Sequence, residues 1–218
     1  MSAQHPVWDL PTRLFHWIVA IAVGLSWLSG EFAEFSYHAW LGYTLLVLVC
    51  WRIVWGFIGS QHSRFSDFLR GPGAVWAYFR GAPYSHPGHN PAGGWSVAIL
   101  LLLLFLQSLS GLFNSDDLLF DGPFYFAASV WFRDMMGVVH EYNFYALQGF
   151  VLLHVAAVAY YQWFLKLPIV QVMILGRAGE RVGQSTPAPI WWALVIVMLA
   201  GGILWWAISQ APKPQLMW

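Results

Sequence analysis

The sequence predicts an all-α fold, an integral membrane helical bundle with a four-helix core and a fifth C-terminal transmembrane helix. Hydrophobic residues make up 59% of the 218 residues and charged residues only 9%, against about 25% in an ordinary soluble domain. The formal net charge is zero, so the sequence lacks the clustered basic excess of a nucleic-acid-binding protein. These observations exclude a soluble globular domain, a disordered chain and a nucleic-acid partner.

Five apolar stretches are long enough to cross a bilayer, which takes about 20 residues as a helix. Polar segments rich in Gly, Pro, Ser, Asp and Arg separate them, and the sequence holds no internal repeat or low-complexity tract. We therefore expect a single transmembrane domain over 1–218 that contacts membrane lipid. The expected spans are 14–30, 38–58, 95–113, 138–165 and 190–209.

The first two spans supply the helices nearest the N-terminus. Span 14–30 resembles a signal peptide only weakly, because 26–30 is a poor cleavage site and Arg13 is the only basic residue of the leader. We therefore expect it to stay in the protein as a helix. Span 38–58 opens with His38 and runs on without a proline.

The remaining spans differ in length and polarity. Span 95–113 follows Asn90-Pro91, a sequence typical of a turn that opens a helix. Span 138–165 is long enough to tilt or to project beyond the bilayer. Span 190–209 has no ionisable side chain and lies outside the four-helix core.

Lysines and arginines in short loops indicate the orientation of a membrane protein. With the N-terminus in the cytoplasm, eight of them lie inside and two outside, and five crossings place the C-terminus in the periplasm. The inner residues are Arg13, Arg52, Arg64, Arg70, Arg80, Lys166, Arg177 and Arg181, and the outer ones are Arg133 and Lys213. Acidic residues show the opposite pattern, with Asp9, Asp67 and Glu180 inside and Glu31, Glu34, Asp116, Asp117, Asp121, Asp134 and Glu141 outside.

Four of the eight histidines lie in or at the ends of the expected spans, where ionisable side chains are costly and indicate function. His140 and His154 share one helix and lie 14 residues apart, which is about 40° short of four full turns and about 21 Å along the axis. They therefore project from nearly the same face at two depths. The topology places His38 level with His140, and His16 level with His154.

Two imidazoles facing each other at one depth suit a haem iron with both axial positions filled by nitrogen. The single cysteine, Cys50, excludes a Cys-x-x-Cys-His attachment site, so the haem would be held without a covalent bond. Two such haems would provide an electron path across the membrane. Each histidine taken alone also fits an interfacial or hydrogen-bonded packing residue. A transport or assembly protein that binds a non-haem metal ion or relays protons is therefore the competing hypothesis.

Glycines and arginines extend this hypothesis. Gly42 and Gly149 are placed where a flat ring would approach a helix backbone, although close helix packing explains them equally well. Arg13 and Arg52 are candidates for the propionates of an inner haem, and Arg133 for those of an outer haem. Their alternative role is to set the topology by reaching the membrane surface.

Two other histidines, His86 and His89, occur in a loop rich in Pro and Gly. Their spacing on irregular backbone is weak support for a metal site. We expect both to be solvated.

Several separated motifs resemble, in the same order, those of the bacterial two-haem b-type cytochromes. This family includes the cytochrome b subunit of nickel-iron hydrogenases, and is similar to the membrane subunit of formate dehydrogenase. The resemblance covers about 7–166. The motifs are Val7-Trp8-Asp9-Leu10-Pro11-Thr12-Arg13-Leu14-Phe15-His16-Trp17, His38-x-x-x-Gly42-Tyr43, Arg52-x-x-Trp55-Gly56-x-x-Gly59, Arg64-Phe65, Gly88-His89-Asn90-Pro91 and the His140/His154 pair.

The resemblance implies two b haems in a four-helix core of a bacterial cytoplasmic membrane protein, with axial histidines from the first, second and fourth helices. It also implies a quinone site near the inner haem, at positions similar to Asn90 and Gly93.

We therefore expect a respiratory electron carrier between the quinone pool and a periplasmic redox protein, either a cytochrome c or a hydrogenase-type subunit. Its acidic outer loops favour a partner with a basic patch. The chain would then be an electron-carrier subunit of an oxidoreductase. The alternative within redox chemistry is a free-standing quinone-linked oxidoreductase acting on a small molecule such as superoxide at the outer haem.

Overall fold

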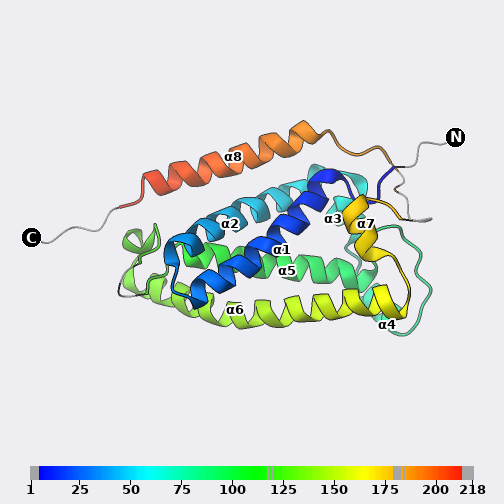
Figure 1. The fold of residues 1–218 in the computed structure, drawn as a ribbon, viewed down its shortest axis with the longest axis horizontal. Helices are drawn as coiled ribbons and strands as arrows, with labels where there is room; N and C mark the ends of the chain where they lie inside the picture. Colours follow the sequence, from blue (N-terminus) through cyan, green and yellow to red (C-terminus); the bar gives the residue numbers. More distant parts are fainter. Residues whose placement is uncertain (1–4, 117, 119, 179–182, 184, 213–218) are drawn as a thin grey trace, which may run out of the picture.

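The computed structural model describes residues 5–116, 118, 120–178, 183 and 185–212 (Figure 1). Over these residues the chain folds as a helical bundle, and five helices are long and apolar enough to cross a membrane. The five expected spans are thereby confirmed. They are α1 (Leu10–Glu31), α2 (Phe35–Ile58), α5 (Pro91–Gly111), α6 (Val130–Ala159) and α8 (Ile190–Ser209).

Short helices complete the chain. The segment between α2 and α5 forms η1 (Gln61–Ser63), α3 (Phe65–Phe68) and α4 (Pro72–Phe79). The turn η2 (Tyr125–Ala127) precedes α6, which continues as the π-helix η3 (Tyr160–Phe164) and is followed by α7 (Ile169–Leu175). In Figure 1, α3, α4 and α7 gather at the end of the bundle where α1 begins.

Four spanning helices, α1, α2, α5 and α6, begin earlier than the hydrophobic pattern predicts, and a polar side chain caps three of them. Asp9 accepts a 2.7 Å hydrogen bond from the Thr12 amide at the start of α1. Asn90 caps α5 in the same way, and Ser129 caps α6. Pro11 and Pro91 occupy the first turns of α1 and α5, where a missing N–H has no cost.

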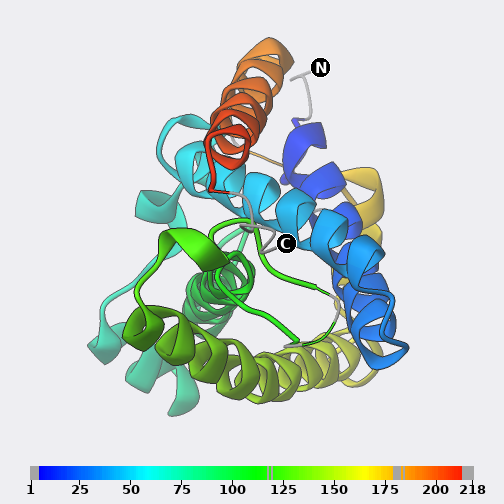
Figure 2. The same cartoon turned by 90° about the vertical axis from the view of Figure 1, so that its left-hand side faces the viewer.

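The helices pack unevenly. α1 packs along α2, α2 along α5 and α8, and α5 along α6, whereas α6 has no comparable packing on α1 or α2. Figure 2 shows α6 on one side and α1 with α2 on the other, with α5 between α2 and α6. The buried core lies among α1, α2, α5 and α6 and consists of Val19, Ala22, Leu45, Val49, Leu101, Leu104 and Leu147.

The fifth helix is attached to α2. Trp51 Nε1 donates to the Ala193 carbonyl at 3.0 Å, and the Ala188 amide donates to Ser60 Oγ at 2.9 Å. The rest of α8 presents large apolar side chains outward, among them Trp205, which is 66% exposed. A bilayer would cover this surface, because exposed apolar patches of this extent are rare in soluble proteins.

Asp9 also ties the start of α1 to the end of α2. Its carboxylate is 2% exposed and accepts hydrogen bonds from Trp55 Nε1 at 3.0 Å and Ser63 Oγ at 3.3 Å. This buried contact fixes the end of the bundle that carries α3, α4 and α7. Of the charged residues used above for the orientation, Asp117, Glu180, Arg181 and Lys213 lie outside the described residues.

Candidate functional site

Two histidines of α6 each face a histidine of another helix, one on α1 and one on α2. The rings of His16 on α1 and His154 on α6 have centroids 6.3 Å apart, with an interplanar angle of 53°. The rings of His38 on α2 and His140 on α6 are 6.2 Å apart, at 75°. The structure thus brings together the residues that the sequence places at matching depths.

Both distances suit two imidazoles bound to one metal. A nitrogen–metal bond of about 2.0–2.1 Å and a ring radius of about 1.2 Å place the two centroids about 6.4 Å apart when the rings lie on opposite sides of the metal. Two histidines in ordinary ring contact, in contrast, need no such spacing. The histidine pairs are therefore the residues that fit a six-coordinate haem iron.

The His38–His140 pair has its ring nitrogens oriented by backbone carbonyls. His38 Nδ1 donates to the Ser26 carbonyl at 2.8 Å, and His140 Nδ1 donates to the Gln107 carbonyl at 3.0 Å. A proton on Nδ1 leaves the lone pair on Nε2, as a metal ligand requires. The Oγ atom of Ser110 lies 3.1 Å from His140 Nδ1 as well.

The His16–His154 pair is less anchored. His16 Nδ1 is buried, and no hydrogen-bond partner for it lies within the described part of the chain. The His16 ring makes an edge contact with Trp17, at a centroid distance of 5.0 Å.

Two glycines that the sequence analysis did not single out lie against the His38–His140 pair. A Cβ at Gly30 would lie 3.1 Å from His38 Nδ1, and a Cβ at Gly111 would lie 3.1 Å from His140 Cε1. Side chains at these positions would therefore push the rings out of place. Only the packing of neighbouring helices identifies them, and this packing leaves no local sequence pattern.

The two predicted glycines have different surroundings. Gly42 is half-buried, and no described atom lies within 4 Å of the position of its missing Cβ. Close packing against another helix therefore does not explain it. Gly149 also has nothing within 4 Å, but it is exposed and lies nine residues from His140, about half a turn around α6. Its expected role beside a ring gains no support from this placement.

The predicted arginines have unpartnered nitrogen atoms. Arg13 Nη1 donates to the Ile174 carbonyl at 2.6 Å, while its Nε is buried without a described partner. Arg52 is 3% exposed, and its Nη1 has no described partner. Arg133 lies over the Tyr125 ring at 4.4 Å and also has a partnerless Nε. Buried donors without acceptors indicate a ligand or ordered water beside them.

Asn90 is at the centre of a polar cluster that joins α4, α5 and η3. Its Oδ1 accepts from the Gly93 amide at 2.7 Å, and its Nδ2 donates to the hydroxyls of Tyr78 and Tyr161 at 3.0 Å each. The two hydroxyls lie 2.5 Å apart, so one donates to the other. The second hydroxyl proton has no acceptor among the described residues and can bind a ligand.

The π-helix places Tyr161 in this cluster, seven residues after His154. Such segments often mark functional sites. Burial, followed by the hydrogen bond to Tyr161, raises the pKa of Tyr78, so its hydroxyl stays a donor.

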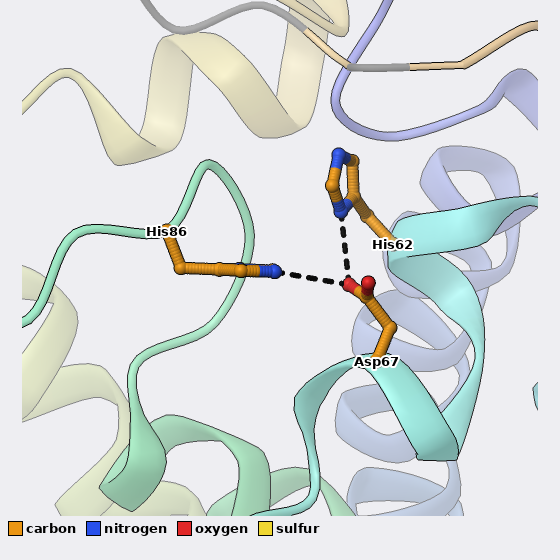
Figure 3. Close-up of side chains that lie close together, drawn as sticks. All are labelled: His62, Asp67 and His86. Carbon is orange, nitrogen blue, oxygen red and sulfur yellow. Dashed lines mark hydrogen bonds and ion pairs between the residues drawn. The ribbon is translucent and has the colours of Figure 1, made fainter.

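The loop histidines differ from the expectation that both are solvated. His86 Nε2 lies 3.2 Å and His62 Nδ1 2.9 Å from Asp67 Oδ2 (Figure 3). The His86 Nδ1 accepts from the Gly88 amide at 3.1 Å, so the His86 proton is on Nε2 and points at Asp67. Although these ligand atoms lie close enough for a metal ion, this tautomer makes them a hydrogen-bonded network that ties α3 to the loop.

Comparison with known proteins identifies one family. A family model described as prokaryotic cytochrome b561 matches residues 7–176, which include all four paired histidines, Asn90 and the η3 segment. No curated protein and no solved structure matches the chain.

Proposed function

The chain belongs to the prokaryotic cytochrome b561 family and has a haem b electron-transfer role in a membrane, and from this we propose that it transfers electrons through two b haems between a periplasmic redox protein and quinone. The observation that carries the proposal is the pair of ring distances, 6.3 and 6.2 Å, both close to the separation of about 6.4 Å for two imidazoles on one metal.

In this proposal His16 and His154 hold the inner haem, and His38 and His140 hold the outer haem. A haem iron bound by two histidines in addition to the porphyrin would pass single electrons and would have no free position for oxygen. The α6 histidines of the two pairs lie 14 residues apart, roughly 21 Å along the helix. Electrons would therefore cross the membrane in two shorter transfers instead of one long one.

Charged side chains near each pair support the placement of the propionates. Arg13 and Arg52 lie at the His16–His154 end, and Arg133 lies seven residues before His140, about two turns along the same face of α6. Their unpartnered nitrogens would donate to carboxylates, and charge-assisted hydrogen bonds of this kind are the strong ones. Gly42 and Gly149 remain proposed ring neighbours, and only Gly42 lies on the face of its helix that carries a paired histidine.

The Asn90 cluster supports a quinone site beside the inner haem. A quinone carbonyl accepts hydrogen bonds, and the free hydroxyl proton of Tyr78 or Tyr161 is a matching donor. Full reduction of the quinone takes two electrons and two protons, with the electrons delivered singly. Gly93 shapes this site, because a Cβ there would lie 3.2 Å from Asn90 Oδ1.

Acidic residues support the choice of partner at the opposite end. Glu31, Glu34, Asp121, Asp134 and Glu141 are all exposed there. Their charge favours a protein with a basic patch, a cytochrome c or a hydrogenase-type subunit, through electrostatic steering. This orientation, with the N-terminus in the cytoplasm, follows from the distribution of arginines and lysines.

The test is a redox titration of the protein purified in detergent, followed by its absorption spectrum. We expect two haem components per chain, both reducible by quinol. A protein without a Soret band would support non-haem metal or proton transport instead. Turnover with quinone and superoxide alone, in the absence of any partner protein, would favour the free-standing oxidoreductase.

A further inference from the structure

His89 is enclosed by aromatic rings although it lies in a loop. Its ring centroid is 4.6 Å from that of Trp8 and 4.8 Å from that of Phe68. The Nδ1 atom is buried, and no partner for it occurs among the residues that the structure describes. A buried ring nitrogen without a partner costs free energy, which a bound group would remove.

Arg52 lies beside the same phenylalanine. Its guanidinium carbon is 6.0 Å from the Phe68 ring and 5.5 Å from the Phe65 ring. Within the described residues, no carboxylate lies within 4.0 Å of it, and its Nη1 atom has no hydrogen-bond acceptor. A cation that is 3% exposed and has no ion pair is strongly unfavourable. The Asp9 carboxylate acts on this charge from farther away, but Nη1 itself still lacks an acceptor.

His89 and Arg52 lie at the depth of the His16–His154 pair. Burial, and after it the charges of Arg52 and His154, lower the pKa of His89 to about 3, so the His89 ring is neutral. The neutral ring carries one N–H donor. His89 and Arg52 thus both contact Phe68, and each has a buried nitrogen without a partner.

We propose that His89 and Arg52 together bind the propionate edge of the inner haem. The inference rests on the proposed function, and it assigns His89 a role that the four axial histidines do not cover. A carboxylate would accept hydrogen bonds from the His89 ring and from Arg52 Nη1, and would give both unpartnered nitrogens an acceptor. Because His89 precedes Asn90, one loop would contact both the inner haem and the quinone.

The test compares His89→Ala, His89→Gln and the matched control His86→Ala in the full chain. His86 lies in the same loop but contacts Asp67 instead. Two readouts are used, the rate of haem loss to apomyoglobin and the midpoint potential of each haem. Combination with His38→Ala, which should retain only the inner haem, identifies the component that changes.

Loss of a hydrogen bond to a charged group costs about 1.5–3 kcal/mol, so His89→Ala should speed the loss of inner haem by about ten-fold or more. Its midpoint potential should fall, because the propionate charge is then less neutralised. His89→Gln, which keeps an N–H donor, should recover part of both effects, and His86→Ala should cause neither.

Unchanged haem loss and potential in His89→Ala would overturn the proposal, as would equal changes in His86→Ala. Complete loss of the inner haem from His89→Ala, with the outer haem retained, would support it. A wild-type protein without two haems would instead refute the proposed function itself, so the two failures are distinguishable.

Discussion

The backbone carbonyl of Ser26 accepts a 2.8 Å hydrogen bond from Nδ1 of His38. This contact joins α1 to α2 beside the His38–His140 pair and holds Nε2 free for a metal. The Gln107 carbonyl does the same for His140 from α5. The His38–His140 pair is thus positioned by contacts from α1 and α5, so changes beside these two contacts should affect the haem of that pair alone.

Gly30→Val should weaken the outer haem selectively. A side chain there meets the His38 ring at 3.1 Å or less, and overpacking of this kind costs about 1–3 kcal/mol. The outer haem should be lost about ten-fold faster or more, and the inner haem should be unaffected. The measurement is haem loss to apomyoglobin. Gly201→Val, with nothing within 4 Å, is the control and should leave both haems unchanged.

Asn90→Ser should lower quinone turnover without changing the haem spectrum. Serine keeps the cap of α5 but removes the amide that orders Tyr78 and Tyr161. The loss of these contacts, at about 1 kcal/mol each, predicts turnover reduced by about ten-fold or more. The assay is quinol-dependent reduction of the haems. Wild-type turnover in this variant would argue against a quinone site at Asn90.

Asp9→Ala should destabilise the end of the bundle where α1 begins. The change removes the cap of α1 and leaves Trp55 Nε1 and Ser63 Oγ without their acceptor. We expect a loss of about 3 kcal/mol in the free energy of unfolding, seen as a lower Tm in detergent. Asp134→Ala, on an exposed position, should leave Tm within about a degree. Equal Tm values for both variants would contradict this role.

Acid should weaken the loop through His86. Burial lowers the pKa of His86 below its ordinary value of 6.5, although Asp67 opposes the shift. The unfolded chain therefore binds a proton first as the pH falls below about 6.5, and the stabilisation present above that pH is lost. His86→Gln does not titrate, so its Tm should fall less steeply with acid than that of the wild type. Parallel Tm curves from about pH 7.5 to 5 would exclude this origin.

Hydrophobic length and histidine spacing predict much of this fold. The expected spans correspond to helices, and the positions of His16, His38, His140 and His154 suffice to pair the rings, since helical geometry is regular over such distances. Asn90-Pro91 indicates the start of α5, whereas the capped starts of α1 and α6 were missed because polar caps lie outside the apolar pattern. The π-helix at η3 was also missed, since hydrophobicity alone does not distinguish a π-helix from the end of an α-helix.

The environment of each ring is harder to predict from sequence. Gly30 lies next to His38 in space although α1 and α2 are separate apolar runs, and Gly111 meets His140 across two helices. His89 was expected in solvent because its neighbours are Gly and Pro, whereas Trp8 and Phe68 from distant segments enclose it. Such contacts depend on how helices pack, which local periodicity does not encode.

The central claim is that four histidines bind two haems in the stated pairs, and counting haem per chain in double variants tests it most directly. His16→Ala with His154→Ala removes one pair and should leave one haem, as should His38→Ala with His140→Ala. His16→Ala with His38→Ala breaks both pairs and should leave none. A folded same-pair variant without haem, or a cross-pair variant that keeps one, would contradict the pairing.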